Sequence, residues 1–137
     1  MIYYRNETFC HDSDIKEEYM QLSKFCSTSL NVITIYRSQS CSQEQLIRGI
    51  KKLVILNRTN LVTGDFNFCY QQQKKQTHSF FTDIKFVQLV NEPTHIGGHI
   101  LDQAYLSNDI GSTESMTEIH AKYYSDHRGI SITLSKR

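Results

Sequence analysis

The 137-residue chain contains no tryptophan, one proline and two alanines. The scarcity of alanine argues against a helical bundle, because alanine has the highest helix propensity of all residues. Threonine, isoleucine, valine, tyrosine and phenylalanine are abundant instead, and these residues favour strands. No apolar run exceeds four residues, whereas a membrane-spanning helix needs about 20. The sequence therefore predicts a strand-rich chain of one-domain length that does not insert into a membrane.

The cysteines and the start of the chain bear on its location. The four cysteines are at least fifteen positions apart, so the chain contains no Cys-x-x-Cys motif. No apolar segment of the signal-peptide type follows the first residues. We therefore expect reduced cysteines in an intracellular protein that is not secreted, and the nucleus is one of the locations left open.

The net charge is close to zero. Fifteen Lys and Arg against fourteen Asp and Glu give +1 with histidine neutral. This balance excludes a basic-tail nucleic-acid binder, an acidic solvating chain and a charge-driven disordered protein. It leaves room for an enzyme that acts on nucleic acid and keeps its positive charge local.

Apolar periodicity predicts a series of short strands. Leu30 to Tyr36 alternates between two faces, which is typical of a half-buried strand. The polar residues 6–17 are expected to form a loop. The other expected strands are Met1–Tyr4, Glu18–Phe25, Asn60–Gly64, Val87–Val90, Ile100–Ser107, Glu114–Ala121 and Gly129–Leu134.

Two helices are expected among these strands. Ser42 followed by Gln45 has the form of a capping box, and Leu46, Ile50 and Leu53 then mark one face of a helix. A second helix is expected near residues 78–86. Strands mixed with two helices predict an α+β layered fold.

Polar side chains stand where several of these strands end. Asp65 and Asn67 follow an apolar strand and a glycine, and residues two apart point to the same side of an extended chain. Tyr36 and Arg37 end another strand, where a hydroxyl and a guanidinium suit a phosphate. The plainer alternatives are an ordinary turn at Gly64 to Asn67, and a core tyrosine beside a surface arginine.

Two further acidic positions stand out near the C-terminus. Asp126 and His127 immediately precede a predicted strand and combine a hard metal ligand with an imidazole that suits a phosphate. Asp102 interrupts an apolar strand, where a carboxylate is costly to bury unless it is paired, for example with a histidine. The alternatives are a surface turn for the first pair and a solvent-exposed edge position for Asp102.

Taken in order, these stretches resemble the endonuclease/exonuclease/phosphatase superfamily. The resemblance is strongest to the endonuclease domains of non-LTR (LINE-type) retrotransposons, through Gln88–His95 and Leu101–Ser107. It implies an α/β four-layer sandwich in which two sheets pack face to face with helices outside. The residues that carry it are Tyr36-Arg37, Gly64-Asp65-Phe66-Asn67, Pro93-Thr94-His95, Leu101-Asp102 with Ser107, and Ser125-Asp126-His127.

The resemblance also implies roles for individual residues in phosphodiester hydrolysis. Asp65 would handle the proton of the attacking water, and Asn67 would contact the phosphoryl oxygens. His127 would contact the scissile phosphate while Asp102 orients it. The remaining implied roles are a phosphate contact at Tyr36, substrate binding at Arg37, and a ligand at Asp126 for Mg²⁺ or Mn²⁺, which prefer oxygen donors.

The sequence departs from the superfamily at its N-terminus. The strands that would carry a metal-binding glutamate are missing, and the glutamates of this part, Glu7, Glu17, Glu18 and Glu44, follow no apolar strand. Residues 1–137 are therefore expected to form one domain, truncated at the N-terminus and holding its metal weakly. The sheet face left uncovered would favour self-association or belong to a longer parent polypeptide.

The function predicted on this basis is metal-dependent phosphodiester hydrolysis, by a DNA endonuclease of retroelement origin. The first alternative is a catalytically inactive truncated domain that retains weak nucleic-acid or phosphate binding. The second is an enzyme that resembles phosphoinositide or sphingomyelin phosphodiesterases.

Overall fold

The structure is a computed structural model that describes residues 9–70, 76–107, 113–122 and 124–136. Within these ranges the chain forms eight strands and two helices, which confirms the mixed α+β class. The expected strand at residues 1–4 lies outside the described residues. The elements are β1 (Cys10–Glu17), β2 (Met20–Cys26), β3 (Leu30–Arg37), α1 (Gln43–Leu53), β4 (Thr59–Asp65), α2 (Gln76–Asp83), β5 (Phe86–Gln88), β6 (Asp102–Ser107), β7 (Thr113–His120) and β8 (Gly129–Lys136).

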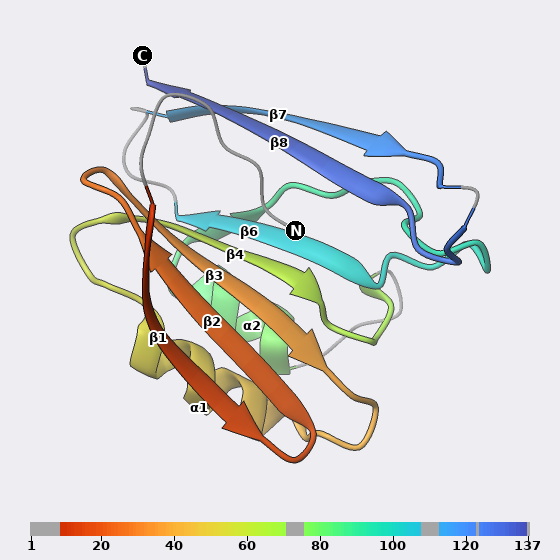
Figure 1. The fold of residues 1–137 in the computed structure, drawn as a ribbon, viewed down its shortest axis with the longest axis horizontal. Coiled ribbons are helices and arrows are strands. Elements are labelled where there is room, and N and C mark those ends of the chain that lie inside the picture. The colour runs from red at the N-terminus through yellow and green to blue at the C-terminus, as the bar shows by residue number, and fades with distance from the viewer. Residues whose placement is uncertain (1–8, 71–75, 108–112, 123, 137) are drawn as a thin grey trace.

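Six strands form a mixed sheet in the order β1-β2-β3-β4-β6-β5. The central pair β3 and β4 is parallel and is connected through α1, whereas the other neighbouring pairs are antiparallel. The hairpin of β7 and β8 forms a second, two-stranded sheet. Figure 1 shows both helices on one face of the large sheet and the β7–β8 hairpin across the other face. The described part of the chain therefore has three layers.

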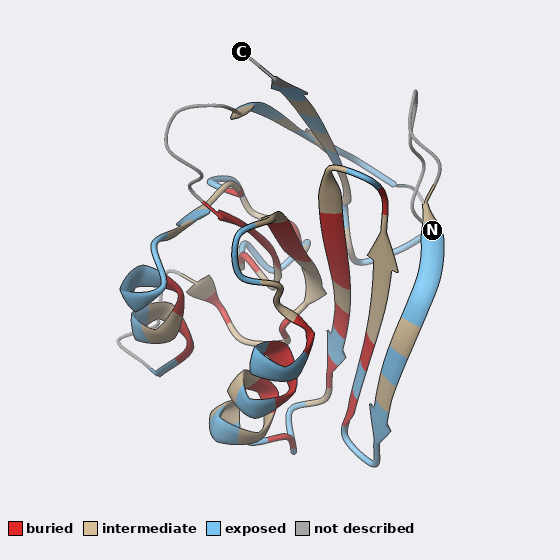
Figure 2. Cartoon of the chain, turned by 90° about the vertical axis from the view of Figure 1, so that its left-hand side faces the viewer, coloured by how far each residue is buried: buried red, intermediate tan, exposed pale blue. Residues whose placement is uncertain are grey.

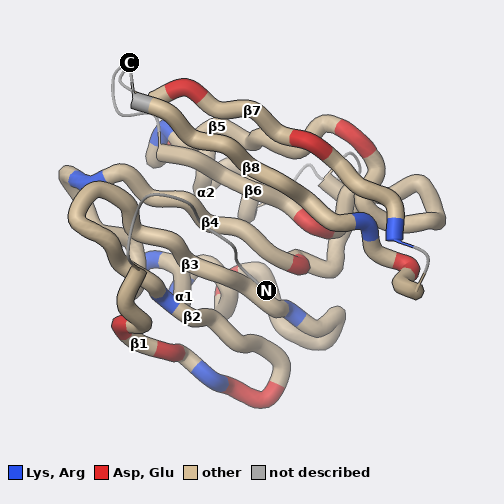
Figure 3. Tube along the Cα trace, turned by 45° about the horizontal axis from the view of Figure 1, so that its top comes forward, with Lys and Arg blue, Asp and Glu red and all other residues tan. Residues whose placement is uncertain are grey.

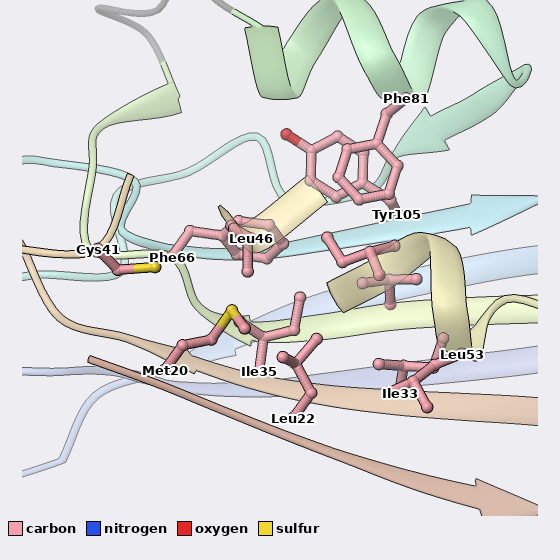
Figure 4. Close-up of a cluster of buried hydrophobic side chains, with 12 residues drawn as sticks. Met20, Leu22, Ile33, Ile35, Cys41, Leu46, Leu53, Phe66, Phe81 and Tyr105 are labelled. Atoms are coloured by element: carbon pink, nitrogen blue, oxygen red, sulfur yellow. The ribbon is translucent and has the colours of Figure 1, made fainter. Parts of the chain in front are cut away.

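The main core lies between the helices and the large sheet. The Ser42 side chain accepts a hydrogen bond from the Gln45 backbone N–H at 3.1 Å, as expected for the start of α1. Leu46, Ile50 and Leu53 are buried against β2, β3 and β4, as the helical pattern predicted. Figure 4 shows Leu46 and Leu53 among side chains of the strands, such as Leu22 and Ile33. In the same core, Phe81 of α2 stacks on Tyr105 of β6 with the ring centroids 3.8 Å apart.

A smaller core lies on the opposite face of the large sheet. Val32, Leu61 and Leu106 are buried there, and half-buried Ile130 and Ile132 of β8 pack against them. Figure 2 shows that burial is concentrated in the central strands and on the inner faces of the helices. The β7–β8 layer is thus held by fewer fully buried side chains than the helical layer.

The prediction of a loop over residues 6–17 is wrong for its described part. Residues 10–17 form β1, which pairs antiparallel with β2 from Cys10 opposite Cys26 to Glu17 opposite Met20. The strand is mostly exposed because it is the outermost strand of the sheet. Its backbone hydrogen bonds to β2 do not require apolar side chains, so the apolar pattern did not reveal it.

The second helix begins and ends earlier than predicted. It stops at Asp83, Lys85 adopts a left-handed φ of 61°, and Phe86 already belongs to β5. Phe81 faces the core, whereas Ile84 lies beyond the helix and is exposed. Neither helix in the described part is long and apolar enough to span a membrane.

Candidate functional site

The candidate site lies at the end of the large sheet where β3 and β4 finish and β6 begins (Figure 1). Tyr36 of β3 is the register partner of Asp65 in β4, and Asp65 is the register partner of Asp102 in β6. Register partners carry their side chains on the same face of a sheet. These three residues therefore form a row on the face that β7 and β8 cover, and His127 stands just before β8.

Asp102 and His127 form the shortest side-chain contact of the site. The His127 Nδ1 atom lies 2.7 Å from Asp102 Oδ2, which confirms the predicted hydrogen bond between these residues. The other ring nitrogen, Nε2, lies 3.9 Å from Asp65 Oδ2. Two carboxylates thus converge on one imidazole, and the three residues span 62 positions of the sequence, from Asp65 to His127.

The electrostatics of this cluster follow from its burial and its charges. Burial raises the pKa of Asp65, and the neighbouring Asp102 carboxylate raises it further. Burial acts to lower the pKa of His127, but the hydrogen bond to Asp102 and the charges of Asp102, Asp65 and Asp126 outweigh it and raise that pKa. The site therefore favours a protonated imidazole beside a carboxylate that accepts protons more readily than usual.

The backbone around Asp65 is held by a glycine and a turn. Gly64 has a φ of 145°, and a Cβ atom at this position would lie 2.0 Å from the Ile35 carbonyl oxygen. The close approach of β4 to β3 at this point therefore requires glycine. Asn67 adopts a left-handed φ of 53°, and its backbone N–H donates to Asp65 Oδ1 at 2.8 Å. This bond fixes the carboxylate and leaves Oδ2 on the side of His127.

Asp126 lies on the other side of His127. Its side chain is 61% exposed, and Oδ2 is 3.4 Å from His95 Nε2. The nearest His and Asp neighbours divide into two groups that share His127, one with Asp65 and Asp102 and one with His95 and Asp126. The predicted metal ligand therefore borders the site beside a histidine to which the sequence analysis gave no role.

Tyr36 and Arg37, the two residues at the end of β3, differ strongly in exposure. Tyr36 is 55% exposed and Arg37 is 7% exposed, the reverse of a core tyrosine beside a surface arginine. The Arg37 guanidinium donates to the carbonyl oxygens of Phe66 and Cys41 and lies over the Phe68 ring. The substrate contact predicted for Arg37 is not made from this position, because the side chain points into the helical layer and holds the chain after β4.

Thr94 is a structural part of the site for which the sequence predicted no role, although it belongs to a stretch that carried the family resemblance. It is fully buried, and its Oγ1 accepts hydrogen bonds from the backbone N–H groups of Leu101 and Asp102 at 3.1 and 3.0 Å. These bonds fix the start of β6 and thereby the Asp102 carboxylate. The sequence signal was a threonine between a proline and a histidine, which carried the family resemblance and by itself indicates only a turn.

The donor atoms fit a hard divalent cation in part. Asp65 and Asp126 offer carboxylate oxygens, the ligands that Mg²⁺ and Mn²⁺ prefer. Among the residues that the structure describes, the two groups of possible ligands contain no glutamate. Within these two groups the oxygen donors are therefore the carboxylates of Asp65, Asp102 and Asp126.

Comparisons with known proteins concern the fold. No protein-family model matches the chain, and no curated protein sequence does. The fold is similar to the crystal structure of the Haemophilus ducreyi cytolethal distending toxin, with a TM-score of 0.63 and 17% sequence identity. The alignment covers 92% of this chain and 57% of that chain, so this chain spans little more than half the length of the matched one.

These findings correct the family that the sequence predicted. The matched structure is a bacterial toxin and not the endonuclease domain of a non-LTR retrotransposon. Most of the short stretches that carried the prediction lie at the ends of β3 and β4, at the start of β6 and just before β8. Such stretches reflect how a fold places polar residues, and they do not separate one family with that fold from another.

Proposed function

We propose that the chain is a divalent-metal-dependent phosphodiester hydrolase that cleaves DNA. The observation that carries this proposal is the convergence of Asp65 and Asp102 on His127 at the shared end of two sheets. A general base, a cationic imidazole and a carboxylate that orients it are the groups that phosphodiester hydrolysis requires.

The proposed roles follow from the contacts of each group. Asp102 accepts the Nδ1 proton of His127 and fixes the ring, so that Nε2 turns toward the space bordered by Asp65. The raised pKa of His127 favours the protonated ring, in which Nε2–H donates to a non-bridging phosphate oxygen. Asp65 Oδ2, with its raised pKa, accepts the proton of the attacking water. Asn67 and the exposed Tyr36 hydroxyl contribute further contacts to phosphate oxygens.

Asp126 is the proposed ligand for the metal, and Asp65 and Asp102 are the acidic groups beside the same imidazole, His127. When bound, Mg²⁺ or Mn²⁺ supplies positive charge at the phosphate oxygens. With few carboxylates in the site, we propose weak metal binding and slow cleavage, because an error of about 1 Å in position can lower a rate by on the order of 100-fold. A domain that retains only phosphate binding is the second candidate, favoured by the same shortage of ligands.

We propose further that residues 1–137 form one domain and that the β7–β8 layer is part of a larger face-to-face sandwich. The two-stranded extent of that layer and the 57% coverage of the matched chain support this. The β7–β8 layer would then be extended by a second copy of the chain or by further strands of a longer polypeptide. Four free cysteines among the described residues are compatible with a reducing, intracellular location.

DNA is the proposed substrate although basic residues are few. Lys and Arg positions are scattered along the described trace in Figure 3 and form no continuous stripe there. Binding that neutralises few phosphates depends only weakly on salt. We therefore expect substrate affinity to change little between low and moderate ionic strength.

The test is a nicking assay on supercoiled plasmid with Mg²⁺ or Mn²⁺. We expect slow nicking by the unmodified chain and its loss in Asp65→Asn and His127→Ala, with Tyr70→Phe as a control that leaves the site intact. Absence of nicking together with retained binding to a DNA oligonucleotide would favour the second candidate. Nicking that persists in both site variants would contradict the proposal.

A further inference from the structure

His95 is the one histidine beside the candidate site that has no place in the proposed chemistry. Its backbone forms an antiparallel bridge with that of His127, and the two rings lie perpendicular with centroids 5.3 Å apart. Two further backbone bonds, from Ile96 N–H to the Asp126 carbonyl and from Arg128 N–H to the Thr94 carbonyl, join the same segments. The position of His95 relative to Asp126 is thus set by the backbone on both sides.

The turn after His95 determines which ring nitrogen carries the hydrogen. The Gly97 backbone N–H donates to His95 Nδ1 at 3.0 Å. A backbone N–H only donates, so Nδ1 is the unprotonated acceptor, and a neutral imidazole then carries its hydrogen on Nε2. The Nε2 atom faces Asp126 Oδ2 at 3.4 Å.

The turn is built closely around this contact. The Thr94 and His95 N–H groups both donate to the His99 carbonyl, and the Gly98 N–H donates to the His95 carbonyl, each at 3.0 Å. A Cβ atom on Gly97 would lie 3.0 Å from His95 Nδ1, which is tighter than ordinary contact. A side chain at Gly97 would therefore push against the ring at the atom that fixes its tautomer.

We infer that His95 is a positioning residue that donates a hydrogen bond from Nε2 to the Asp126 carboxylate and so holds it for a divalent cation. The assignment excludes His95 as a direct ligand in this arrangement, because its Nδ1 is occupied by Gly97 and its Nε2 carries hydrogen. In the Asp102–His127 pair the carboxylate orients the imidazole, whereas in the His95–Asp126 pair the imidazole orients the carboxylate. The inference rests on the proposed function for the role of Asp126 as a ligand.

Hydrogen-bond partners of metal-binding carboxylates affect the metal directly. Removing such a partner typically lowers metal affinity by about 10–100-fold. We therefore expect His95→Ala to weaken Mn²⁺ binding by this factor. His95→Gln retains a side-chain donor and should recover part of the affinity, and Gly97→Ala should weaken binding although His95 is unchanged.

The experiment titrates Mn²⁺ into the full chain and measures free Mn²⁺ by electron paramagnetic resonance. His11→Ala is the matched control, because it removes a histidine that is paired with an aspartate, Asp14, at 2.8 Å on the exposed strand β1. Long-range proton–nitrogen spectra of the unmodified chain read the tautomer of His95 directly and need neither activity nor a variant. We expect hydrogen on Nε2 and none on Nδ1.

The outcomes separate this inference from the proposed function. Equal Mn²⁺ affinity of the unmodified chain and His95→Ala would overturn the inference and leave the proposed function standing. Hydrogen on Nδ1 of His95 would overturn it as well. If the unmodified chain binds no Mn²⁺, both the inference and the metal-dependent function are wrong.

Discussion

Replacing Gly64 by alanine tests whether the approach of β4 to β3 sets the geometry of the site. A Cβ atom at position 64 would lie 2.0 Å from the Ile35 carbonyl oxygen and 2.8 Å from the Ile35 nitrogen. Both are backbone atoms, so neither can rotate away. The φ of 145° adds conformational strain for any residue with a side chain.

The expected magnitude has two contributions. A strained φ costs about 1–3 kcal/mol, and forcing extra volume into packed structure costs about 1–3 kcal/mol more. Gly98→Ala provides the matched comparison, because Gly98 has a φ of 83° but no atom within 4 Å of the added Cβ. We therefore expect Gly64→Ala to lower the free energy of unfolding by about 2–6 kcal/mol and Gly98→Ala by about 1–3 kcal/mol.

Urea denaturation followed by circular dichroism measures both free energies of unfolding. The total for a chain of this length is roughly 7–20 kcal/mol, so the larger loss remains measurable. Asp65 follows Gly64 directly, and its displacement should also reduce nicking more in Gly64→Ala than in Gly98→Ala. Equal destabilisation by the two substitutions would show that the contact with Ile35 does not constrain β4, and the reasoning would fail.

Three further predictions concern the core, the imidazole and the turn before β6. Leu46→Ala should lower the free energy of unfolding by about 2–5 kcal/mol because the side chain is fully buried. Arg48→Ala, on the exposed face of the same helix, should change it by less than about 0.5 kcal/mol. Similar urea midpoints for the two variants would contradict the assigned buried face of the helix. Asp102→Asn should lower the pKa of His127 in a nuclear magnetic resonance titration. Because that pKa is raised in the folded chain, His127 stabilises the fold fully below its unfolded pKa, and this stabilisation is lost as pH rises through the folded pKa. The difference in free energy of unfolding between the unmodified chain and Asp102→Asn should therefore become smaller toward alkaline pH. A difference that stays constant with pH would refute this reasoning. Thr94→Val should cost about 1–3 kcal/mol by leaving two backbone N–H groups without their acceptor, and an unchanged thermal midpoint would show that those groups find other partners.

The sequence predicted the elements whose pattern directly reflects burial. The helical face of Leu46, Ile50 and Leu53 reports which side chains are removed from water. The alternation over Leu30 to Tyr36 located β3, although both faces of this strand carry buried side chains. A carboxylate within an apolar strand needs a partner, which suggested a histidine near Asp102, and the family resemblance gave His127 as that histidine. In each case the composition of a short segment carries the physical constraint.

Other features depend on contacts that no local pattern encodes. Arg37 is buried beneath the carbonyl oxygens of Phe66 and Cys41 and the ring of Phe68. Cys41 is close in the sequence, but Phe66 is 29 positions away, and nothing around Arg37 in the sequence indicates that contact. The pairing of His95 with Asp126 depends on a backbone bridge between two loops. The family was misjudged because polar residues at strand ends are set by the fold and recur in different families.

The polarity of β1, which concealed it from the apolar pattern, has a consequence for how the protein meets other chains. β1 ends the large sheet, so one edge of its backbone faces outward. Asp12, Asp14 and Lys16 are exposed along it, and charges on an outer strand discourage another strand from adding there. A second chain that approached this edge would have to desolvate those charges before gaining any backbone hydrogen bond. Within the described residues, the charges on β1 therefore oppose the addition of another strand at this edge of the large sheet.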